Sequence, residues 1–239
     1  MSGAPLILAV ECATRVASVA IARGDAVCVV RAGTSEQHHA ESLLAEVDAA
    51  LREAEVGLAD VEAFAVTLGP GAFTSLRIGL ATVKGLAFGS GRPVAAVSTL
   101  AVVAHAAPPA LRRVAAVLDA RRGEVYAGEF DRSSGQPSLV GTEAVESAEA
   151  LIERLSPDTP LVGEWPPGLD GVAAAERLVP TSPQAPPRAA ALASLALPIL
   201  ARGEGVAAAA LSPRYLRRAE AEEKRLASGS SVDTPQGLQ

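Results

Sequence analysis

Cysteine and aromatic residues are scarce in this sequence. Of its 239 residues only two are cysteines, Cys12 and Cys28, and 3% are aromatic. Two cysteines are too few for the disulfide framework that stabilises small secreted domains. Because bulky rings are rare, the core has to be built mainly from Ala, Val, Leu and Ile. Hydrophobic residues make up 49% of the chain, an ordinary globular balance, and the length allows one large domain or two modest ones.

An excess of basic residues is also missing. The formal net charge is −6 and the pI is near 5.2. A protein that held tRNA by itself would be expected to carry a basic field that neutralises phosphates. The chain has no apolar run near the roughly 20 residues of a membrane helix, and its start lacks the basic-then-apolar pattern of a signal peptide. We therefore expect a cytoplasmic protein without membrane contacts, in which another subunit holds most of any nucleic acid.

The first half of the chain alternates short apolar runs with two helical stretches. One helix is expected at about 36–54, where Thr34 and Gln37 fit a capping box, and another at about 72–90. Three strands, a helix, a strand, a helix and a strand follow one another, as in a ribonuclease-H-like lobe, the repeated unit of the actin and sugar-kinase superfamily. Several α/β folds begin in this order, so the order alone is a weak signal. The predicted strands, each a short apolar run, are residues 6–10, 17–22, 26–31, 63–68 and 93–98.

The second half repeats part of this pattern. A boundary near residue 107, before Pro108 and Pro109, divides the chain into comparable halves. The expected fold is therefore α/β, with two ribonuclease-H-like lobes that are each a mixed sheet flanked by helices. We assign residues 1–106 to the N-terminal lobe, 107–218 to the C-terminal lobe and 219–239 to a flexible tail. The elements predicted after the boundary are strands at 114–118, 124–130 and 139–141 and helices at 148–155 and 189–202.

Residues 69–79 read GPGAFTSLRIG and follow a predicted strand. Gly-Pro-Gly allows a sharp turn and a close approach of backbone or ligand, and the helix that follows begins with amide groups that can bind an anion. A P-loop, however, needs Gly-Lys-Ser/Thr where this chain has Ala72-Phe73-Thr74, and a dinucleotide fingerprint needs glycine at Thr74. The segment is therefore a weak phosphate motif.

The helix that begins in this segment has few polar positions. Apolar side chains spread around most of its circumference, and small residues such as Ser75, Gly79 and Gly85 allow close packing. A helix on one face of a sheet usually shows a polar outer side. Two interpretations stay open: the helix is buried inside its own chain, or it forms a protein–protein interface.

Residues that would support catalysis are few. The histidines are His38, His39 and His105, and no two of them stand four apart, the spacing that puts two metal ligands on one helical face. Neither His-Glu-x-x-His nor Gly-x-Ser-x-Gly occurs, and we interpret Cys12 as a small buried residue. Glu11 follows the first strand where sugar kinases carry an Asp that holds hydrated magnesium, and its extra methylene alters that geometry. We expect no catalytic residue and no metal site in this chain.

Five short motifs, spread from about residue 6 to 217, occur in the order found in one known family. They are ILAVECAT (7–14), GPGAFTSLRIG (69–79), VSTL (97–100), DARRGEVY (119–126) and PRYLR (213–217). The second differs at Ala72 and Ser75 from the family's Gly-Pro-Gly-Ser-Phe-Thr-Gly-Leu-Arg-Ile-Gly. The first has Glu-Cys-Ala-Thr where Asp-Thr-Ala-Thr is usual. On these motifs the chain is identified as a member of the TsaB (YeaZ) family.

The resemblance implies a pseudo-enzyme with the two-lobed fold of TsaD, the catalytic subunit of tRNA threonylcarbamoyladenosine synthesis. TsaB proteins pair with TsaD through the first two helices of the N-terminal lobe, or with themselves when TsaD is absent, and the ATPase TsaE joins the pair. The complex transfers a threonylcarbamoyl group to adenosine 37 of tRNAs that read codons beginning with A. By this resemblance ATP and a metal ion are expected in the partner subunits only, and tRNA contacts only through the complex.

Two sets of residues follow from the resemblance. The expected partner interface, on the helices at 36–54 and 72–90, comprises Leu43, Val47, Thr74, Leu76, Arg77, Leu80, Val83 and Lys84. A vestigial nucleotide pocket is expected at Glu11, Thr14, Gly69, Gly71 and Ser98. The substitution Leu80→Arg is expected to prevent pairing with TsaD, because it would bury an unpaired charge at the interface.

Two other functions stay open at this point. The first is an active small-molecule kinase or ATPase of the same superfamily. The second is a peptidase that acts on TsaD. Turnover of ATP that Glu11→Ala abolishes would indicate the first, and cleavage of TsaD would indicate the second.

Overall fold

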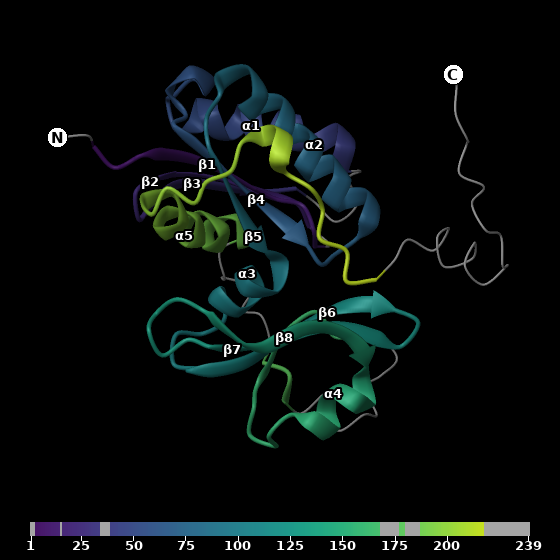
Figure 1. Ribbon diagram of the computed structural model, residues 1–239. Helices are drawn as coiled ribbons and strands as arrows, with labels where there is room; N and C mark the ends of the chain where they lie inside the picture. Colours follow the sequence, from purple (N-terminus) through teal and green to yellow (C-terminus); the bar gives the residue numbers. More distant parts are fainter. Residues whose placement is uncertain (1–2, 15, 34–38, 168–176, 180–186, 218–239) are drawn as a thin grey trace, which may run out of the picture.

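The computed structural model of the chain describes residues 3–14, 16–33, 39–167, 177–179 and 187–217. It has two lobes, each built on a mixed β-sheet flanked by helices (Figure 1), so the expected α/β fold class is confirmed. The capping box predicted at Thr34 and Gln37 and the tail predicted at 219–239 lie outside the described residues. Within the described part of the chain, no helix has the length and apolarity needed to cross a membrane.

The five-stranded sheet of the first lobe has the order β3-β2-β1-β4-β5. Strand β1 is antiparallel to β2 and parallel to β4, which is in turn parallel to β5. Because β1 is central and buried on both faces, it is a continuous apolar run rather than an alternating one. Gly24, with φ of 60°, makes the tight turn from β2 to β3. The bounds are Leu6–Glu11 (β1), Ser18–Arg23 (β2), Ala26–Ala32 (β3), Ala63–Gly69 (β4) and Val94–Ser98 (β5).

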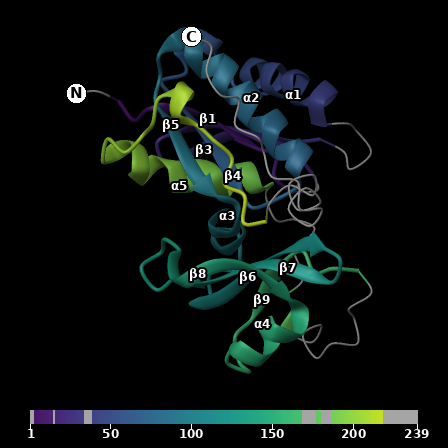
Figure 2. The same ribbon diagram turned by 45° about the vertical axis from the view of Figure 1, so that its right-hand side comes forward.

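Helices cover both faces of this sheet. Helices α1 and α2 lie side by side on one face, and α5 lies on the other (Figure 2). The face under α1 and α2 carries large side chains such as Leu8 and Phe64, whereas the face under α5 carries small ones such as Ala9 and Ala65. The bounds are His39–Glu53 (α1), Phe73–Ser90 (α2) and Arg188–Ala201 (α5).

The four-stranded sheet of the second lobe has the order β8-β7-β6-β9. Helix α4 packs on one face through Leu151, and α3 packs on the other through Leu100 and Val103. Strand β8 is longer than the predicted 139–141. The prediction was too short because Gly141 at φ 83° and a register shift against β7 interrupt the alternation of apolar and polar residues. The bounds are Arg113–Arg121 (β6), Glu124–Asp131 (β7), Ser138–Ser147 (β8), Leu161–Gly163 (β9), Thr99–His105 (α3) and Ala148–Arg154 (α4).

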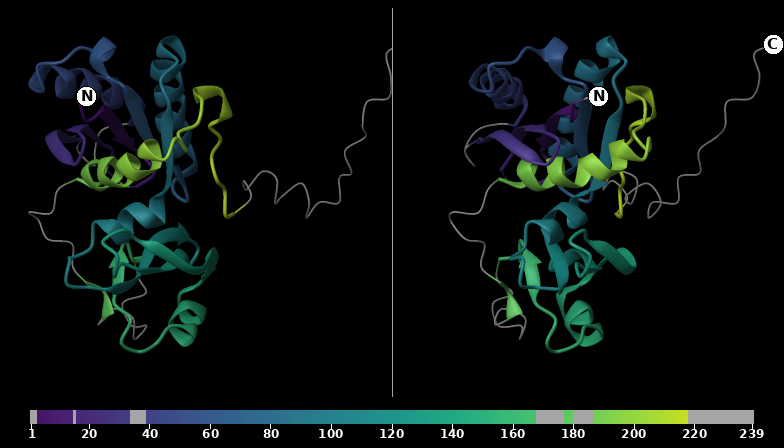
Figure 3. Two further views of the ribbon diagram at one scale, coloured as in Figure 1. Left: turned by 60° about the vertical axis from the view of Figure 1, so that its left-hand side comes forward. Right: turned by 90° about the vertical axis from the view of Figure 1, so that its left-hand side faces the viewer.

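The end of the described chain returns to the first lobe. Helix α5, which the sequence analysis assigns to the lobe at 107–218, packs on the first sheet instead (Figure 3). The physical reason is the lining of small residues on that sheet face, which lets buried residues of α5 such as Leu192 approach closely. After α5, Val206 pairs with Val94 of β5, and a 3-10 turn at Ala208–Ala210 packs against α2. The described residues of the chain therefore cross between the lobes more than once.

Candidate functional site

The turn between β4 and α2 is built on glycines that admit the chain's own backbone. Gly69 has φ of 114°, and a Cβ there would lie 2.7 Å from the carbonyl oxygen of Arg214. A Cβ on Gly71 would lie 2.3 Å from the carbonyl oxygen of Ala13. The Ala72 amide donates to that same oxygen at 3.1 Å. These glycines are therefore needed for close packing within the chain, at the place where a phosphate loop would admit a ligand.

Glu11, the last residue of β1, is fully buried and has both carboxylate oxygens engaged. One accepts a hydrogen bond from the Ala13 amide at 2.8 Å, and the other accepts one from the Thr14 hydroxyl at 2.7 Å. Burial raises the pKa of Glu11, against the lowering influence of the Arg188 charge at the start of α5. Arg188 itself pairs with Glu164 at 2.8 Å. Glu11 and Thr14 thus close the turn that follows β1.

This corner does not fit a nucleotide held by hydrated magnesium. An ion held through water needs carboxylate oxygens that face an open site, and those of Glu11 are buried and used by Ala13 and Thr14. The space next to Gly71, where a phosphate would approach the turn, is filled by Ala13. Of the expected pocket residues, the structure brings Glu11, Thr14 and Gly71 together around this filled turn.

The other two expected pocket residues belong to a connection between the lobes. Gly69 lies against Arg214, whose guanidinium pairs with a carboxylate oxygen of Glu143 on β8 at 2.8 Å. The Ser98 hydroxyl, at the end of β5, donates to the other carboxylate oxygen of Glu143. A buried carboxylate of the second lobe is thus held by a hydroxyl and an arginine from the first-lobe side. Gly69 and Ser98 therefore serve contacts within the chain and not a nucleotide pocket.

Cys12 lies beneath α2 and lacks the environment of a nucleophile. Burial and, to a lesser degree, the neighbouring Glu11 raise the pKa of its thiol to about 12, so the thiol stays protonated near neutral pH. His105 shares a hydrogen bond with Ser194 at 3.0 Å and links α3 to α5. Among the residues with described coordinates, no group of three or more His, Cys, Asp and Glu side chains could hold a metal ion. His38 lies outside those residues, so the expected lack of a metal site stays a prediction.

Five of the eight side chains expected at the partner interface are buried in the chain's own core. Each is at most 4% exposed, and they pack beneath α1 and α2: Leu43, Val47, Leu76, Leu80 and Val83. Side chains with so little exposed surface can give a partner almost no contact area, so this part of the prediction is corrected. Their role is to hold the two helices on the sheet. Thr74 and Arg77 are exposed and Lys84 is half-buried, so these three remain surface residues.

A different set of residues faces outward, and we call it the outer α1/α2 face. Leu44 is 56%, Phe73 is 38% and Phe88 is 78% exposed. Between the two phenylalanines, the exposed residues of α2 on the same side include the small Ala81 and Gly85. Sequence reasoning missed Leu44, Phe73 and Phe88. The signal available for Leu44 was the Leu43-Leu44 pair, since side chains of neighbouring residues on a helix point about 100° apart. We define the face by Leu44, Phe73, Arg77, Ala81, Gly85 and Phe88.

The PRYLR motif lies beside the first turns of α2. The ring of Tyr215 stacks on that of Phe73, with 5.1 Å between centroids and 24° between planes. Arg77 donates from Nε to the Tyr215 hydroxyl at 2.9 Å, and its guanidinium carbon lies 3.9 Å from the centroid of the Phe73 ring. Sequence reasoning used the motif for the resemblance but gave it no place in the site. Because 138 residues separate Arg77 from Tyr215, no local pattern could reveal the contact.

The fold and this corner define a class of protein first. The first sheet has three antiparallel strands followed by two parallel ones, and a second lobe lies beyond α3. The chain is therefore a two-lobed α/β protein in which its own residues fill the corner where β1 and β4 end.

Comparison with known proteins narrows the class to a family. A family model described as TsaD, tRNA N6-adenosine threonylcarbamoyltransferase, matches residues 32–166. The tRNA threonylcarbamoyladenosine biosynthesis protein TsaB of Escherichia coli K12 is 37% identical over 162 residues, which are 66% of this chain and 68% of that protein. The protein of the same name from Bacillus subtilis 168 is 27% identical over 232 residues, 93% of this chain and 98% of that protein. The solved structure of YeaZ from Pseudomonas aeruginosa matches with a TM-score of 0.74 and 38% identity, covering 89% of this chain and 100% of that one. The chain belongs to the TsaB (YeaZ) family.

Proposed function

We propose that this chain is a non-catalytic accessory subunit in cytoplasmic tRNA threonylcarbamoyladenosine biosynthesis. It pairs with a TsaD-type catalytic subunit, a TsaE-type ATPase joins the pair, and the complex transfers the threonylcarbamoyl group to adenosine 37 of tRNA. Without that partner the chain pairs with itself through the same face. The observation that carries the proposal is the outer α1/α2 face, where Leu44, Phe73 and Phe88 are turned toward solvent. The names of the TsaB relatives support a part in the same biosynthesis.

The shape of this face favours packing against the helices of another protein. Ala81 and Gly85 leave the middle of α2 smooth, so a second helix can approach its backbone closely. The large side chains Phe73 and Phe88 stand near the two ends of α2 and Leu44 stands on α1. Exposed apolar surface of this kind marks interaction sites on soluble proteins.

The filled corner at the ends of β1 and β4 supports a role without turnover. Glu11 is buried and bonded to Ala13 and Thr14, and the Cys12 thiol is held protonated. Neither group is placed to transfer a phosphoryl or an acyl group. ATP and a metal ion would then be handled by the partner subunits.

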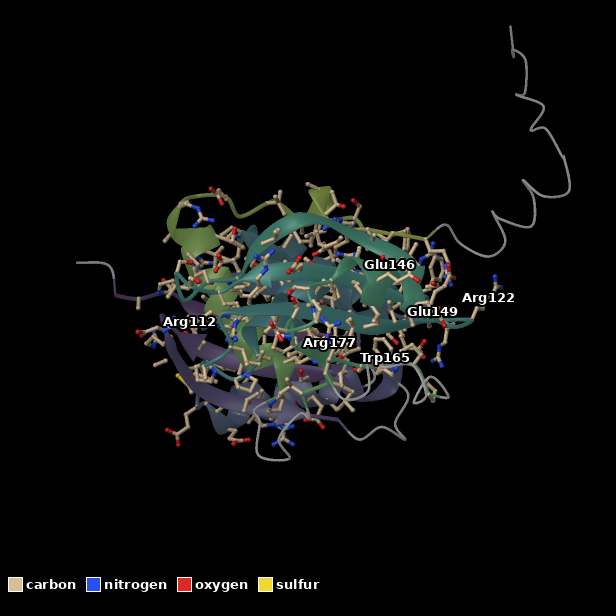
Figure 4. The ribbon with its side chains drawn as sticks, turned by 90° about the horizontal axis from the view of Figure 1, so that it is seen from below. Arg112, Arg122, Glu146, Glu149, Trp165 and Arg177 are labelled. Atoms are coloured by element: carbon tan, nitrogen blue, oxygen red, sulfur yellow. The ribbon has the colours of Figure 1, made fainter. Side chains whose placement is uncertain are left out.

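The distribution of basic residues supports contact with tRNA through the complex. On the underside of the second lobe, Arg112 and Arg122 lie at opposite ends and Arg177 lies between them (Figure 4). Arg177 donates to the carbonyl oxygens of Ser156 and Thr159, so its guanidinium is already used within the chain. Basic side chains spread in this way, on a chain of net charge −6, favour a subunit that leaves phosphate contacts to its partners.

The substitution Ala81→Arg tests the surface. It places a charge at the centre of the outer α1/α2 face, which costs little in the free chain because the site is exposed. In a complex the charge would be buried without a partner, so affinity for the TsaD-type subunit of the same organism should fall by about a hundredfold or more. Ala201→Arg, on the exposed end of α5 on the opposite side of the sheet, is the matched control. Co-elution of Ala81→Arg with the TsaD-type subunit at full yield would show that the surface is wrongly assigned.

Reconstitution tests the function itself. Purified TsaD-type and TsaE-type subunits should modify tRNA with this chain present and lose most of that activity without it or with Ala81→Arg. The pure chain alone should show no ATP turnover above background. Turnover that Glu11→Ala abolishes would indicate a kinase or ATPase instead, and a mass change in the TsaD-type subunit after incubation would indicate a peptidase.

A further inference from the structure

We propose that the stack of Phe73, Arg77 and Tyr215, which we call the arginine stack, binds a carboxylate side chain of the partner subunit. The proposal rests on the proposed function, and it names the chemistry of one contact within that interface. It also gives the C-terminal PRYLR motif a part in partner binding. The contact would lie where α2 begins, at one end of the outer α1/α2 face.

The guanidinium of Arg77 is held in place on two sides. Its Nε donates to the Tyr215 hydroxyl at 2.9 Å, and its carbon lies over the Phe73 ring at 3.9 Å and 6.0 Å from the Tyr215 ring centroid. A cation over an aromatic face is attracted by the ring electrons. An arginine fixed in this way loses little side-chain entropy on binding, which is how a pre-organised group gains affinity.

The two terminal amino groups of Arg77 are available to a ligand. Within the part of the chain that the structure describes, Nη1 and Nη2 of Arg77 have no hydrogen-bond or ion-pair partner. The residue is exposed and so are the two rings beside it, with Phe73 at 38% and Tyr215 at 39%. The planar fork of a guanidinium matches the two oxygens of a carboxylate. Arginine and aromatic residues together are the common composition of interface hot spots.

The PRYLR segment is itself anchored to both lobes, so Tyr215 is a fixed support. The Arg214 amide donates to the Leu68 carbonyl at 2.8 Å, and its side chain pairs with Glu143 at 2.8 Å. On the other side of Tyr215, Arg217 donates to the Ala120 carbonyl at 2.7 Å and pairs with Glu124. Tyr215 is therefore a positioning residue, which acts on the partner through Arg77.

A protein carboxylate is favoured over a tRNA phosphate as the occupant. The arginine stack is continuous with the outer α1/α2 face, because Phe73 and Arg77 belong to both. The rest of that face is mostly apolar, at Leu44, Ala81 and Phe88, with the exposed Thr74 and the half-buried Lys84 beside them. A mostly apolar surface suits a protein better than a phosphate backbone. A single acidic side chain set in an apolar helix contact would meet the arginine when the two surfaces join.

The test measures affinity for the TsaD-type subunit by calorimetry at low and at high salt. Arg77→Gln should weaken binding about tenfold or more at low salt and make the affinity less dependent on salt, because a screened charge pair has been removed. Arg77→Lys, which keeps the charge and loses the fork, should recover only part of the loss. Tyr215→Phe, which keeps the ring and removes only the hydroxyl, should weaken binding several-fold. Arg202→Gln, at an exposed pair with Glu204 beyond α5, should bind like the wild type.

The outcomes separate this inference from the proposed function. If Arg77→Gln binds with unchanged affinity and salt dependence while Ala81→Arg does not bind, the arginine stack is not a docking site and the helical interface stands. If Arg77→Gln loses affinity for tRNA and not for the TsaD-type subunit, the occupant is a phosphate and the inference is wrong. If the wild type does not bind the TsaD-type subunit at all, both proposals fall. Because Arg77 is exposed, unchanged circular dichroism and melting temperature are expected for each variant.

Discussion

The two sides of helix α2 are both largely apolar and have opposite roles. The inner side holds Leu76, Leu80 and Val83, each at most 4% exposed. The outer side holds Ala81 and Phe88, and both are exposed. An amphipathic surface helix would mark this division with charged residues, and α2 has almost none. What distinguishes the sides is size and contact: branched side chains against the sheet, and small residues between two rings toward solvent.

The glycines of α2 show the same division in geometric terms. A Cβ on Gly79 would lie 2.8 Å from the Cβ of Cys12, whereas a Cβ on Gly85 would have no heavy atom within 4 Å among the atoms that the structure describes. Gly79 is therefore small so that the helix can lie directly on the end of β1. No contact of Gly85 within the described chain requires a glycine at that position. A smooth surface for a partner would explain why a small residue stands there. The comparison of the two sides is thus open to direct test.

The largest difference is expected between neighbouring arginine substitutions. Leu80→Arg puts a charge into the core under α2, at a cost of more than about 4 kcal/mol, which is comparable with the whole stability of many domains. Ala81→Arg puts the same side chain in solvent and should change the free energy of unfolding by less than about 0.5 kcal/mol. Chemical denaturation of both proteins measures this. Equal stability of the two variants would contradict the orientation of α2. If Leu80→Arg is destabilised as expected, its loss of partner binding would report unfolding and not an interface.

The two cysteines probe how deeply the inner side is buried. Cys12 lies under Gly79 and Cys28 is exposed on β3. Burial raises the pKa of the Cys12 thiol from an ordinary 9.0 to about 12, which lowers its thiolate fraction at pH 8 about a thousandfold. Iodoacetamide at pH 8 should therefore alkylate Cys28 and spare Cys12, and raising the pH toward 12 should increase the reactivity of Cys12.

Peptide mass mapping of the native protein measures the two rates. The control is the same reaction in denaturant, where both thiols should react at similar rates. Rapid alkylation of native Cys12 at pH 8 would show that α2 does not seal the end of β1.

Much of the fold follows from sequence patterns, because burial on both faces leaves apolar runs. Strand β1 is visible as residues 6–10 and α2 as a helix from about residue 72, within a residue or two of the structure. Strand β8 is underestimated, since Gly141 breaks the alternation on which a strand is recognised. The side of the molecule to which α5 belongs was not predictable, because its position depends on the small residues of strands far away in the sequence.

The candidate site is less predictable than the fold, for two physical reasons. A helix with apolar residues all around gives no period from which its inner side could be chosen, so Leu80 and Ala81 are equivalent in the sequence. The arginine stack is made by Arg77 and Tyr215, and a contact across 138 residues leaves no local pattern. Glu11 was found because it follows a strand at a known position, but its hydrogen bonds within the turn are a property of the fold alone.

A smaller effect is expected from adding one methyl group on each side of α2. Gly79→Ala forces the new Cβ against Cys12, where backbone and Cβ cannot move aside easily, and should lower the free energy of unfolding by about 1 to 2 kcal/mol. Gly85→Ala meets open space and should raise it by about 0.5 to 1 kcal/mol, because alanine is the better helix former. Urea denaturation resolves both signs. If both variants changed the free energy of unfolding in the same direction, the geometric distinction between the two sides of α2 would be wrong.

The smallest effect on the fold is expected at Phe88, and there the comparison is sharpest. Phe88 is 78% exposed, so Phe88→Ser removes little buried apolar area and should change the free energy of unfolding by less than about 0.5 kcal/mol. If the outer side is a partner surface, the same substitution should still weaken binding to the TsaD-type subunit about tenfold. A large aromatic side chain that is exposed in the free chain adds little to its stability, but it adds much to binding energy once a partner buries it. Arg52→Ser, at an exposed position of α1 paired only with Asp48 among the described residues, provides a comparison of similar exposure without a ring. A loss of stability larger than the loss of affinity would mean that Phe88 supports the fold, and that the outer side of α2 ends before it.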